Sequence, residues 1–294
     1  MLRVSARKRC VHMTEVSLLK VQNLRVSYPI HSSILQRRIG ENMAVKDVNF
    51  TISAGQTVGL VGESGSGKST VARTIIGLEK ADGGRIEFEG RDITQSTRTE
   101  LKALRRDMQM VFQDPFASLN PRLSVQEIIV EPWLAHPDVV PKNRRASEAK
   151  ALMDRVGLNP DYASRFPHQF SGGQRQRIGI ARALALQPKL IICDEAVSAL
   201  DVSVQAQVLN LLDDLKQEFN LAYLFISHDL SVIEHICDRV LVLNGGVVVE
   251  EGTPRELFEN PQDDYTKRLF AAVPVIRPWL NGASSKPAGT IPRY

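Results

Sequence analysis

The sequence predicts an α/β protein with a mostly parallel core sheet, a partly antiparallel sheet beside it and an inserted helical segment. Segments 190–196 and 222–227 are apolar runs typical of strands that are buried on both faces, and a helical periodicity separates them. Segment 17–28 alternates apolar and polar residues, which is typical of a strand with one exposed face. Segment 114–170 has mainly helix and loop patterns and lies between two core elements.

Further strands follow in the N-terminal part of the chain. In segment 29–42, proline, serine and glycine break the alternation, so we expect a surface excursion there. Segment 43–61 predicts two strands that are joined by a tight connection. Segment 85–93 predicts another alternating strand, which the turn residues at 82–84 introduce.

Most helical patterns lie in the second half of the chain. Apolar residues at i, i+3, i+4 and i+7 predict a helix over 145–156, and segment 173–186 is also helical in pattern. An apolar stripe predicts a longer helix over 203–219. Segment 239–250 predicts a hairpin that is turned by Asn-Gly-Gly. Thr253 is the expected N-cap of a last helix, because proline and glutamate follow it at the first and third helical positions.

The composition is that of an ordinary soluble globular protein. Of the 294 residues, 43% are hydrophobic and 24% are charged, which excludes a disordered chain, a collagen and a coiled-coil rod. The net charge of +4 is mild, and we expect no nucleic-acid partner. No segment has the length of an apolar membrane span or the h-region of a secretory signal. Three widely spaced cysteines (Cys10, Cys193 and Cys237) favour a reducing compartment.

The string GESGSGKST carries the most specific chemical signal. It fits the phosphate-loop pattern G-x-x-x-x-G-K-[ST], and it follows a predicted strand and precedes a predicted helix. Glycines let backbone N–H groups surround phosphate oxygens, and the helix N-terminus adds further donors. Lys68 would reach the β and γ phosphates, and Ser69 would bind Mg²⁺. The alternative interpretation of the string is a glycine-rich turn that binds no ligand. The loop comprises Gly62, Glu63, Ser64, Gly65, Ser66, Gly67, Lys68, Ser69 and Thr70.

Two acids, Asp194 and Glu195, end the apolar strand LIIC. A carboxylate placed there is costly unless a cation accompanies it. Mg²⁺ held by Asp194 through water would satisfy this requirement, and Glu195 would then accept a proton from an attacking water. The alternative is two acids that merely cap the end of a strand.

The remaining candidates are ambiguous as isolated residues. The string SGGQ, with Ser171 as N-cap, opens a helix that either binds nothing or binds the nucleotide of another subunit. His228 follows a strand that we expect beside the Asp194 strand, where ligands of open α/β folds bind, although packing or capping is the commoner role. Gln113 follows a short apolar run. It is either a site residue at the end of a strand or an ordinary exposed glutamine. Tyr28 is either strand packing or a stacking face for adenine.

Taken together, these motifs resemble the nucleotide-binding subunit of an ATP-binding-cassette (ABC) transporter. The motifs occur in the order GESGSGKST, FQDP, SGGQ, LIICDEA, SALD and SHD, and the resemblance covers about residues 18–273. The longer strings VFQDPFASLNPR, CDEAVSALDVSVQAQVLNLL and EEGTPRELFENPQDDYTKRLFAAVP resemble the oligopeptide and dipeptide importer ATPases, a group that includes nickel importers. The resemblance implies a P-loop NTPase cassette with a RecA-like core, an antiparallel β-subdomain and an inserted helical subdomain.

The resemblance also implies a role for each matching residue. Glu195 would be the catalytic base and His228 would hold the γ-phosphate, while Gln113 would contact Mg²⁺ and water and report to the membrane subunits. Tyr28 would stack on adenine. Ser171 and Gly173, with Gln174 beside them, would bind the γ-phosphate held by a partner subunit, and the loop at 198–201 would join the two sites. The implied catalytic residues are Glu195, His228, Gln113 and Lys68, and the implied Mg²⁺ residues are Ser69, Gln113 and Asp194.

The same resemblance sets expectations for domains, cofactors and partners. It implies a nucleotide-binding domain over 13–256, with its helical subdomain at about 114–170, between a basic tail at 1–12 and a C-terminal extension at 257–294. The implied cofactors are ATP and Mg²⁺. Many relatives bind an iron–sulfur centre through C-terminal cysteines, but no cysteine follows Cys237 here, so we expect none. The partners would be a second, different ATPase subunit, two permeases and a solute-binding protein at the cytoplasmic face of a bacterial inner membrane.

Three functions follow from this pattern. The first is an ATPase subunit of an importer, with peptides as the leading substrate and nickel, glutathione or another solute left open. The second is a soluble ATPase of the same superfamily that acts on DNA or the ribosome, but the coiled-coil insertions or fused cassettes typical of that class are missing. The third is a subunit that binds ATP without turnover, against which Glu195 and His228 argue.

Overall fold

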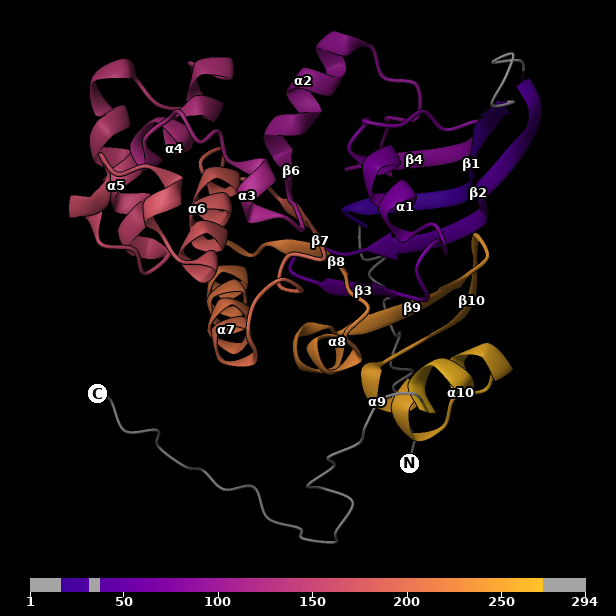
Figure 1. Cartoon of the computed structure of the whole chain (residues 1–294). Helices are drawn as coiled ribbons and strands as arrows, with labels where there is room; N and C mark the ends of the chain where they lie inside the picture. Colours follow the sequence, from indigo (N-terminus) through magenta and orange to yellow (C-terminus); the bar gives the residue numbers. More distant parts are fainter. Residues whose placement is uncertain (1–16, 32–37, 272–294) are drawn as a thin grey trace, which may run out of the picture.

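The computed structural model describes residues 17–31 and 38–271. Within these residues, ten strands form one sheet in the order β5-β4-β1-β2-β10-β9-β3-β8-β7-β6, and helices cover it (Figure 1). The predicted basic tail at 1–12 and the loose tail after Pro274 lie outside the described residues.

One half of the sheet is the predicted parallel core. Its strands are, in spatial order, β9 (Arg239–Asn244), β3 (Thr57–Val61), β8 (Ala222–Ile226), β7 (Leu190–Asp194) and β6 (Met108–Val111). Every pair of neighbours in this set is parallel. The strand β7 is buried along its whole length, with Leu190 and Ile192 in one core cluster and Ile191 and Cys193 in the other. An apolar run without alternation therefore forms a strand that is covered on both faces.

The other half of the sheet is mainly antiparallel. It contains β5 (Arg91–Asp92), β4 (Gly83–Phe88), β1 (Leu19–His31), β2 (Arg38–Ile52) and β10 (Val247–Gly252). The strands β9 and β10 form the predicted hairpin around Gly245 and Gly246. Within this half, a single parallel pairing between Val247 and Asp47 joins β10 to β2, and the antiparallel pairing of β10 with β9 connects this half to the parallel core.

Two expectations for this half were wrong. Much of the surface excursion expected at 29–42 is strand, because β1 and β2 continue past the proline and pair at Pro29 with Glu41 and at Ile30 with Gly40. Proline is tolerated in strands where its missing N–H is not needed. The single strand expected over 85–93 is the hairpin β4–β5, which turns at Glu89 and Gly90, both with positive φ.

The helices lie on both faces and at the two ends of the sheet (Figure 1). They are α1 (Lys68–Ile75), α2 (Arg98–Asp107), α3 (Pro115–Ser118), α4 (Val125–Ala135), α5 (Arg145–Arg155), α6 (Gly172–Leu184), α7 (Val202–Phe219), α8 (Leu230–Ile236), α9 (Pro254–Glu259) and α10 (Asp264–Ala271), with short 3₁₀ turns at 142–144, 160–162 and 167–169. The segment between β6 and α6 is helix and loop, as predicted. Thr253 caps α9 with the predicted capping box. None of the helices in the described residues is long and apolar enough to cross a membrane.

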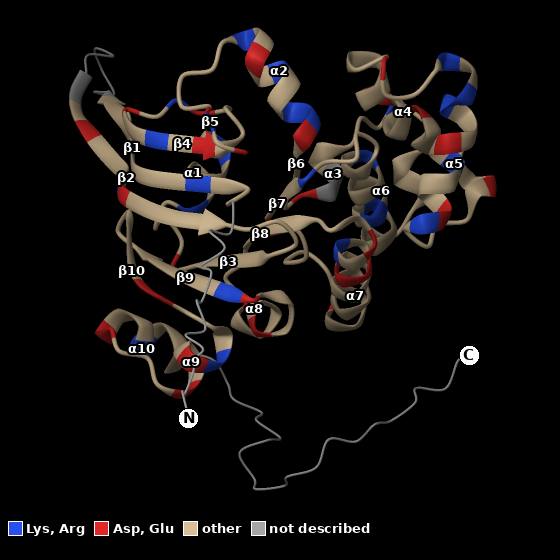
Figure 2. Ribbon diagram, turned by 180° about the vertical axis from the view of Figure 1, so that it is seen from behind, with Lys and Arg blue, Asp and Glu red and all other residues tan. Residues whose placement is uncertain are grey.

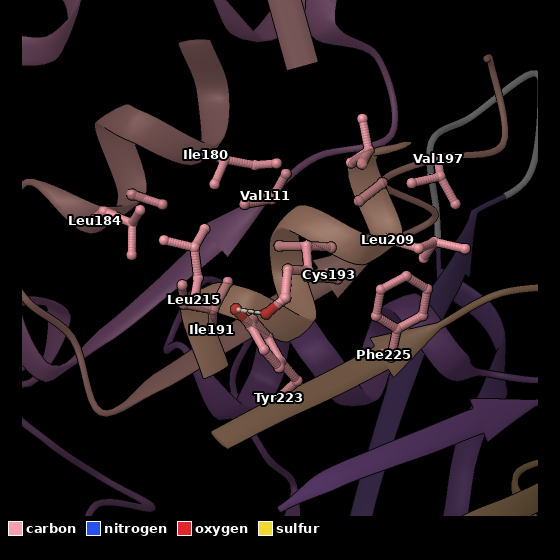
Figure 3. Packing of buried hydrophobic residues seen from close by; sticks show 14 of the residues in the cluster. Val111, Ile180, Leu184, Ile191, Cys193, Val197, Leu209, Leu215, Tyr223 and Phe225 are labelled. Atoms are coloured by element: carbon pink, nitrogen blue, oxygen red, sulfur yellow. Dashed lines mark hydrogen bonds between the residues drawn. The ribbon is translucent and has the colours of Figure 1, made fainter. Parts of the chain in front are cut away.

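Two hydrophobic cores lie on opposite faces of the parallel strands. One joins these strands to α1 and to the antiparallel half, and the other joins them to the helices α4 to α8. Figure 3 shows part of the second core, where Cys193 of β7 and Phe225 of β8 lie among side chains of α6 and α7. There the Tyr223 hydroxyl donates to the Leu212 carbonyl oxygen at 3.0 Å, which satisfies a buried polar group.

Candidate nucleotide-binding site

The predicted site residues converge at one edge of the sheet. Because β3, β6, β7 and β8 are parallel, their carboxyl ends meet there. The segment 62–67 follows β3, Gln113 lies two residues beyond β6, Glu195 follows β7, and His228 lies two residues beyond β8. Four segments that are far apart in the chain thus lie at one edge.

The phosphate loop has the conformation that its glycines permit. Gly67 is the N-cap of α1 and has φ +107°, in the left-handed region that favours glycine. A Cβ atom on Gly67 would lie 2.4 Å from the Ala44 carbonyl oxygen, so β2 also requires a residue without a side chain there. The loop consequently ends on a helix N-terminus whose first backbone N–H groups can face an anion.

Lys68 is folded onto the loop that contains it. Its Nζ atom donates to the carbonyl oxygens of Gly62 at 2.7 Å and Glu63 at 2.8 Å, and it lies 3.4 Å from the Ser66 hydroxyl. The side chain is buried, and this burial lowers the pKa of its ammonium group, while Glu195, Asp194 and Glu63 oppose that shift by attraction. Lys68 is thus a buried cation that is held in the centre of the site.

Asp194 and Ser69, two of the three residues predicted to lie at Mg²⁺, contact each other directly. The Ser69 hydroxyl donates to Oδ1 of Asp194 at 2.9 Å, although the two residues lie 125 positions apart. Burial raises the pKa of the Asp194 carboxyl, while the Ser69 hydrogen bond and the nearby Arg73 partly oppose the rise. A carboxylate and a hydroxyl are oxygen donors of the kind that Mg²⁺ prefers, and the unfavourable burial of the carboxylate fits a cation beside it.

Glu195 lies in a constrained position at the end of β7. Its φ is +51°, an uncommon value for a residue with a side chain, and its N–H donates to the Ile226 carbonyl oxygen at 3.0 Å. The Oε1 atom of Glu195 is 3.2 Å from Nδ1 of His228. His228 is 60% exposed and Glu195 is 21% exposed, so the imidazole faces the open side of the pair. Strained backbone of this kind is concentrated at functional sites.

Tyr28 and Gln113 are the outer members of the site. The half-buried Tyr28 comes from β1, and its hydroxyl donates to the Thr70 hydroxyl oxygen at 3.4 Å, which places it beside the first turn of α1. Gln113 is exposed at the end of β6. The structure therefore brings Tyr28 to the phosphate loop and leaves Gln113 on the surface of the same sheet edge.

The SGGQ segment is a well-formed helix start of its own. The Ser171 hydroxyl accepts from the Gln174 N–H at 3.3 Å, and the Gln174 side chain accepts from the Ser171 N–H at 3.0 Å. A Cβ atom on Gly173 would lie 2.2 Å from Cγ1 of Val204 in α7. In the described part of the chain, no hydrogen bond joins these residues to the phosphate loop of the same chain.

Two contacts to the phosphate loop were not expected from the sequence. The Gly246 N–H in the β9–β10 turn donates to the Ser66 carbonyl oxygen at 3.1 Å. The Glu63 N–H donates to the Tyr265 hydroxyl oxygen at 2.8 Å, and Tyr265 belongs to α10 near the end of the described chain. No local signal marks either contact, because both join segments more than 170 positions apart.

Comparisons with known proteins agree with this arrangement. The family described as ABC transporter matches residues 45–198, which contain the phosphate loop, Asp194 and Glu195. Over 262 residues the chain is 52% identical to the oligopeptide transport ATP-binding protein AppF of Bacillus subtilis (strain 168), covering 89% of this chain and 79% of that protein. The chain belongs to the ABC transporter family. Within it, this ABC ATPase groups with the ATPases of peptide importers, as the sequence strings predicted.

A second group of relatives is longer than this ABC ATPase. The glutathione import ATP-binding protein GsiA of Escherichia coli (strain K12) is 52% identical over 261 residues, which make up 89% of this chain but only 42% of that protein. The chain therefore spans less than half the length of this relative.

Solved structures confirm the ABC cassette fold. The ATP-binding cassette MJ0796, in a dimeric post-hydrolysis state bound to ADP and phosphate, superposes with a TM-score of 0.71 at 30% identity over 81% of this chain and 99% of that one. The cassette cbiO1 from Clostridium perfringens gives the same TM-score at 29% identity, over 84% of this chain and 92% of its own. This ABC ATPase thus has a fold that binds nucleotide.

Proposed function

We propose that this ABC ATPase is the subunit of an importer that binds and hydrolyses ATP, and that the imported solute is a peptide or a related small molecule. The observation that supports it most directly is the meeting of Lys68, the Ser69–Asp194 pair and the Glu195–His228 pair at one sheet edge. These groups are of the kinds that phosphoryl transfer to water requires: a cation, an oxygen-donor pair for a metal ion, and a base.

In the proposed reaction, ATP and water give ADP and phosphate. The loop N–H groups and Lys68 would hold the phosphate oxygens, and Tyr28 would stack on the adenine ring. Ser69, Asp194 and Gln113 would hold Mg²⁺, which supplies positive charge against the phosphate oxygens. Glu195 would take a proton from the attacking water, while His228 would bind the γ-phosphate and orient the Glu195 carboxylate.

The helix start at Ser171, Gly173 and Gln174 would contact a nucleotide only in a dimer. It offers N–H groups and a positive dipole end to an anion, yet it makes no hydrogen bond to its own phosphate loop within the described residues. We infer that it meets the γ-phosphate held by a second ATPase subunit. The cassette MJ0796 is dimeric in two solved structures, which supports a dimer of ATPase subunits. Because the resemblance implies that such ATPases pair with a different but related subunit, a heterodimer is favoured.

The transport assignment comes from the relatives. AppF is an oligopeptide transport protein and GsiA is a glutathione import protein, so a peptide-like solute is the leading substrate. The proposed partners are two membrane permeases and a solute-binding protein, and the proposed place is the cytoplasmic face of the inner membrane. The proposed division of the chain is a nucleotide-binding domain at 13–256, with helical residues 114–170, and a C-terminal extension at 257–294.

Charge placement along two helices does not favour a nucleic-acid partner. In Figure 2, lysines and arginines alternate with aspartates and glutamates along α2 and α5. Nucleic-acid-binding proteins usually carry a basic stripe along one face. The soluble ATPase acting on DNA or the ribosome is consequently the weaker candidate.

Nucleotide binding by the purified chain is the first test. We expect Lys68→Ala to weaken the binding of labelled ATP with Mg²⁺ on the order of a hundredfold, because it removes the central cation of the site. Lys189→Ala is the matched control, since Lys189 pairs with Glu89 on the surface, and it should bind ATP normally. If the wild-type chain retained no label, or if Lys68→Ala changed nothing, the proposal would be overturned.

Steady-state hydrolysis is the second test. With reconstituted permeases, we expect ATP turnover well above that of Lys68→Ala. Turnover no higher than in that variant would favour a subunit that binds ATP without hydrolysing it.

A further inference from the structure

The helix α10, the last helix of the described residues, reaches the phosphate loop through one side chain. The Glu63 N–H donates to the Tyr265 hydroxyl oxygen at 2.8 Å, across 202 positions of sequence. This N–H points to α10, so it is not among those that can surround a phosphate. The contact therefore acts on the loop from outside the nucleotide site.

The same residue of the loop is held from its other side as well. The Glu63 carbonyl oxygen accepts from Nζ of Lys68 at 2.8 Å and from the Ser66 N–H at 3.2 Å. Glu63 thus links Tyr265 to Lys68 through a single residue of backbone. A rotation of the backbone at Glu63 would shift the carbonyl that holds the central lysine.

Tyr265 is itself firmly positioned. Its own N–H donates to the Asp263 carboxylate at 2.8 Å, which caps the start of α10. The Glu250 carboxylate of β10 accepts from the N–H groups of Gln262 at 2.8 Å and Asp263 at 3.0 Å, and so fixes the turn before the helix. The Tyr265 side chain is only 8% exposed and belongs to the larger hydrophobic core. Its hydroxyl is therefore presented to the loop by a fixed scaffold.

We propose that Tyr265 is a positioning residue for the phosphate loop, so that the helix α10 sets how tightly this ABC ATPase binds ATP. The inference rests on the proposed function of the loop. Tyr265 touches neither the phosphates nor the reacting water. Tyr265 holds the backbone of Glu63 in place. It thereby positions the Glu63 carbonyl oxygen, which accepts from Nζ of Lys68.

The substitution Tyr265→Phe tests this proposal, because it keeps the buried ring and removes only the hydroxyl. The loss of one neutral hydrogen bond predicts an ATP dissociation constant raised about three- to tenfold. In the reconstituted transporter, the KM for ATP should rise by a similar factor while kcat stays within about twofold, since no reacting group is lost. A fluorescent ATP analogue measures the affinity in the isolated chain.

Tyr223→Phe is the matched control. Tyr223 is also a buried tyrosine whose hydroxyl bonds a backbone group, the Leu212 carbonyl at 3.0 Å, but it lies away from the phosphate loop. Removing this hydroxyl should lower the melting temperature and leave ATP affinity unchanged. A weaker affinity in both variants would attribute the effect to general destabilisation and would overturn the proposal.

Hydrogen exchange of the loop amides separates this inference from the proposed function. In the nucleotide-free chain, Tyr265→Phe should speed exchange of the Glu63 amide at least about threefold, since its acceptor is gone. Tyr223→Phe should not change exchange at that position. Unchanged exchange and affinity in Tyr265→Phe would overturn the positioning role alone. Wild-type chain that binds no nucleotide would instead overturn both the proposed function and the inference built on it.

Discussion

Nδ1 of His228 lies 3.2 Å from Oε1 of Glu195, at the carboxyl ends of two neighbouring parallel strands. A carboxylate only accepts hydrogen bonds, so the Nδ1–H tautomer is the one that can donate to Glu195. The Glu195 N–H is also bonded to the Ile226 carbonyl oxygen, which holds the backbone of the two strand ends together. The carboxylate and the imidazole are thereby oriented as a pair toward the open edge of the sheet.

Replacing Glu195 by glutamine should stop hydrolysis but not binding. We expect kcat to fall about 100- to 10,000-fold, because a general base contributes that range, while ATP stays bound. The variant should collect as an ATP-bound dimer, visible as a doubled mass on size exclusion with ATP. Glu259→Gln, which alters a surface pair with Arg255, is the control with normal turnover. Rapid turnover by the Glu195 variant would contradict its assignment as the base.

His228→Ala should lower kcat with a smaller effect on ATP affinity. The variant removes the group that orients Glu195 and would contact the γ-phosphate, so we expect a loss on the order of tenfold to a hundredfold in kcat. Steady-state kinetics with the reconstituted partners measures kcat and KM separately. Combining His228→Ala with Glu195→Gln should add little to the loss of the glutamine variant alone, because both act on one step. Additive losses would show that the two residues act independently.

Asp194→Asn should stabilise the nucleotide-free chain while abolishing activity. Burial raises the folded-state pKa of Asp194, so the folded chain holds this proton more tightly and loses stability as the pH rises through the raised pKa. Above the raised pKa the buried charge is present, and its removal should raise the melting temperature by about 2–4 °C for each kcal/mol relieved. The difference between variant and wild type should shrink as the pH falls and Asp194 takes up its proton. A lower melting temperature for the variant at neutral pH would refute this account.

Gly173→Ala should destabilise the chain through a specific clash. The new Cβ would lie 2.2 Å from Cγ1 of Val204, and such overpacking costs about 1–3 kcal/mol of unfolding free energy. Adding Val204→Ala removes that atom and should recover at least half of the loss. Gly179→Ala in the same helix is the control, because nothing lies within 4 Å of its added Cβ, and it should be neutral or stabilising. Urea unfolding of the three variants and the wild type measures each free energy of unfolding.

The sequence patterns predicted most elements around the site, the parallel core and the β9–β10 hairpin. The apolar run of β7 and the apolar stripe of α7 identified a strand and a helix, because the spacing of apolar residues in the local sequence indicates which faces of an element are buried. The strand expected over 85–93 proved to be the hairpin β4–β5, since a turn at Glu89 and Gly90 depends on backbone conformation as well as on pattern. No helix was predicted over 264–271, where the structure has α10 with Tyr265.

The candidate site divides in the same way. The string from Gly62 to Thr70 and the acids after β7 were identifiable from the sequence alone, because a phosphate loop needs its residues in one continuous order. The sequence also predicted that the His228 strand lies beside the Asp194 strand, and the parallel pairing of β7 with β8 confirms this prediction. The folded chain decided which side chains meet there, with Ser69 bonded to Asp194 and His228 next to Glu195, since these contacts depend on non-local packing. Only the folded chain brings Tyr265 to Glu63, because a contact across 202 positions depends on how both cores pack and leaves no mark on the local sequence.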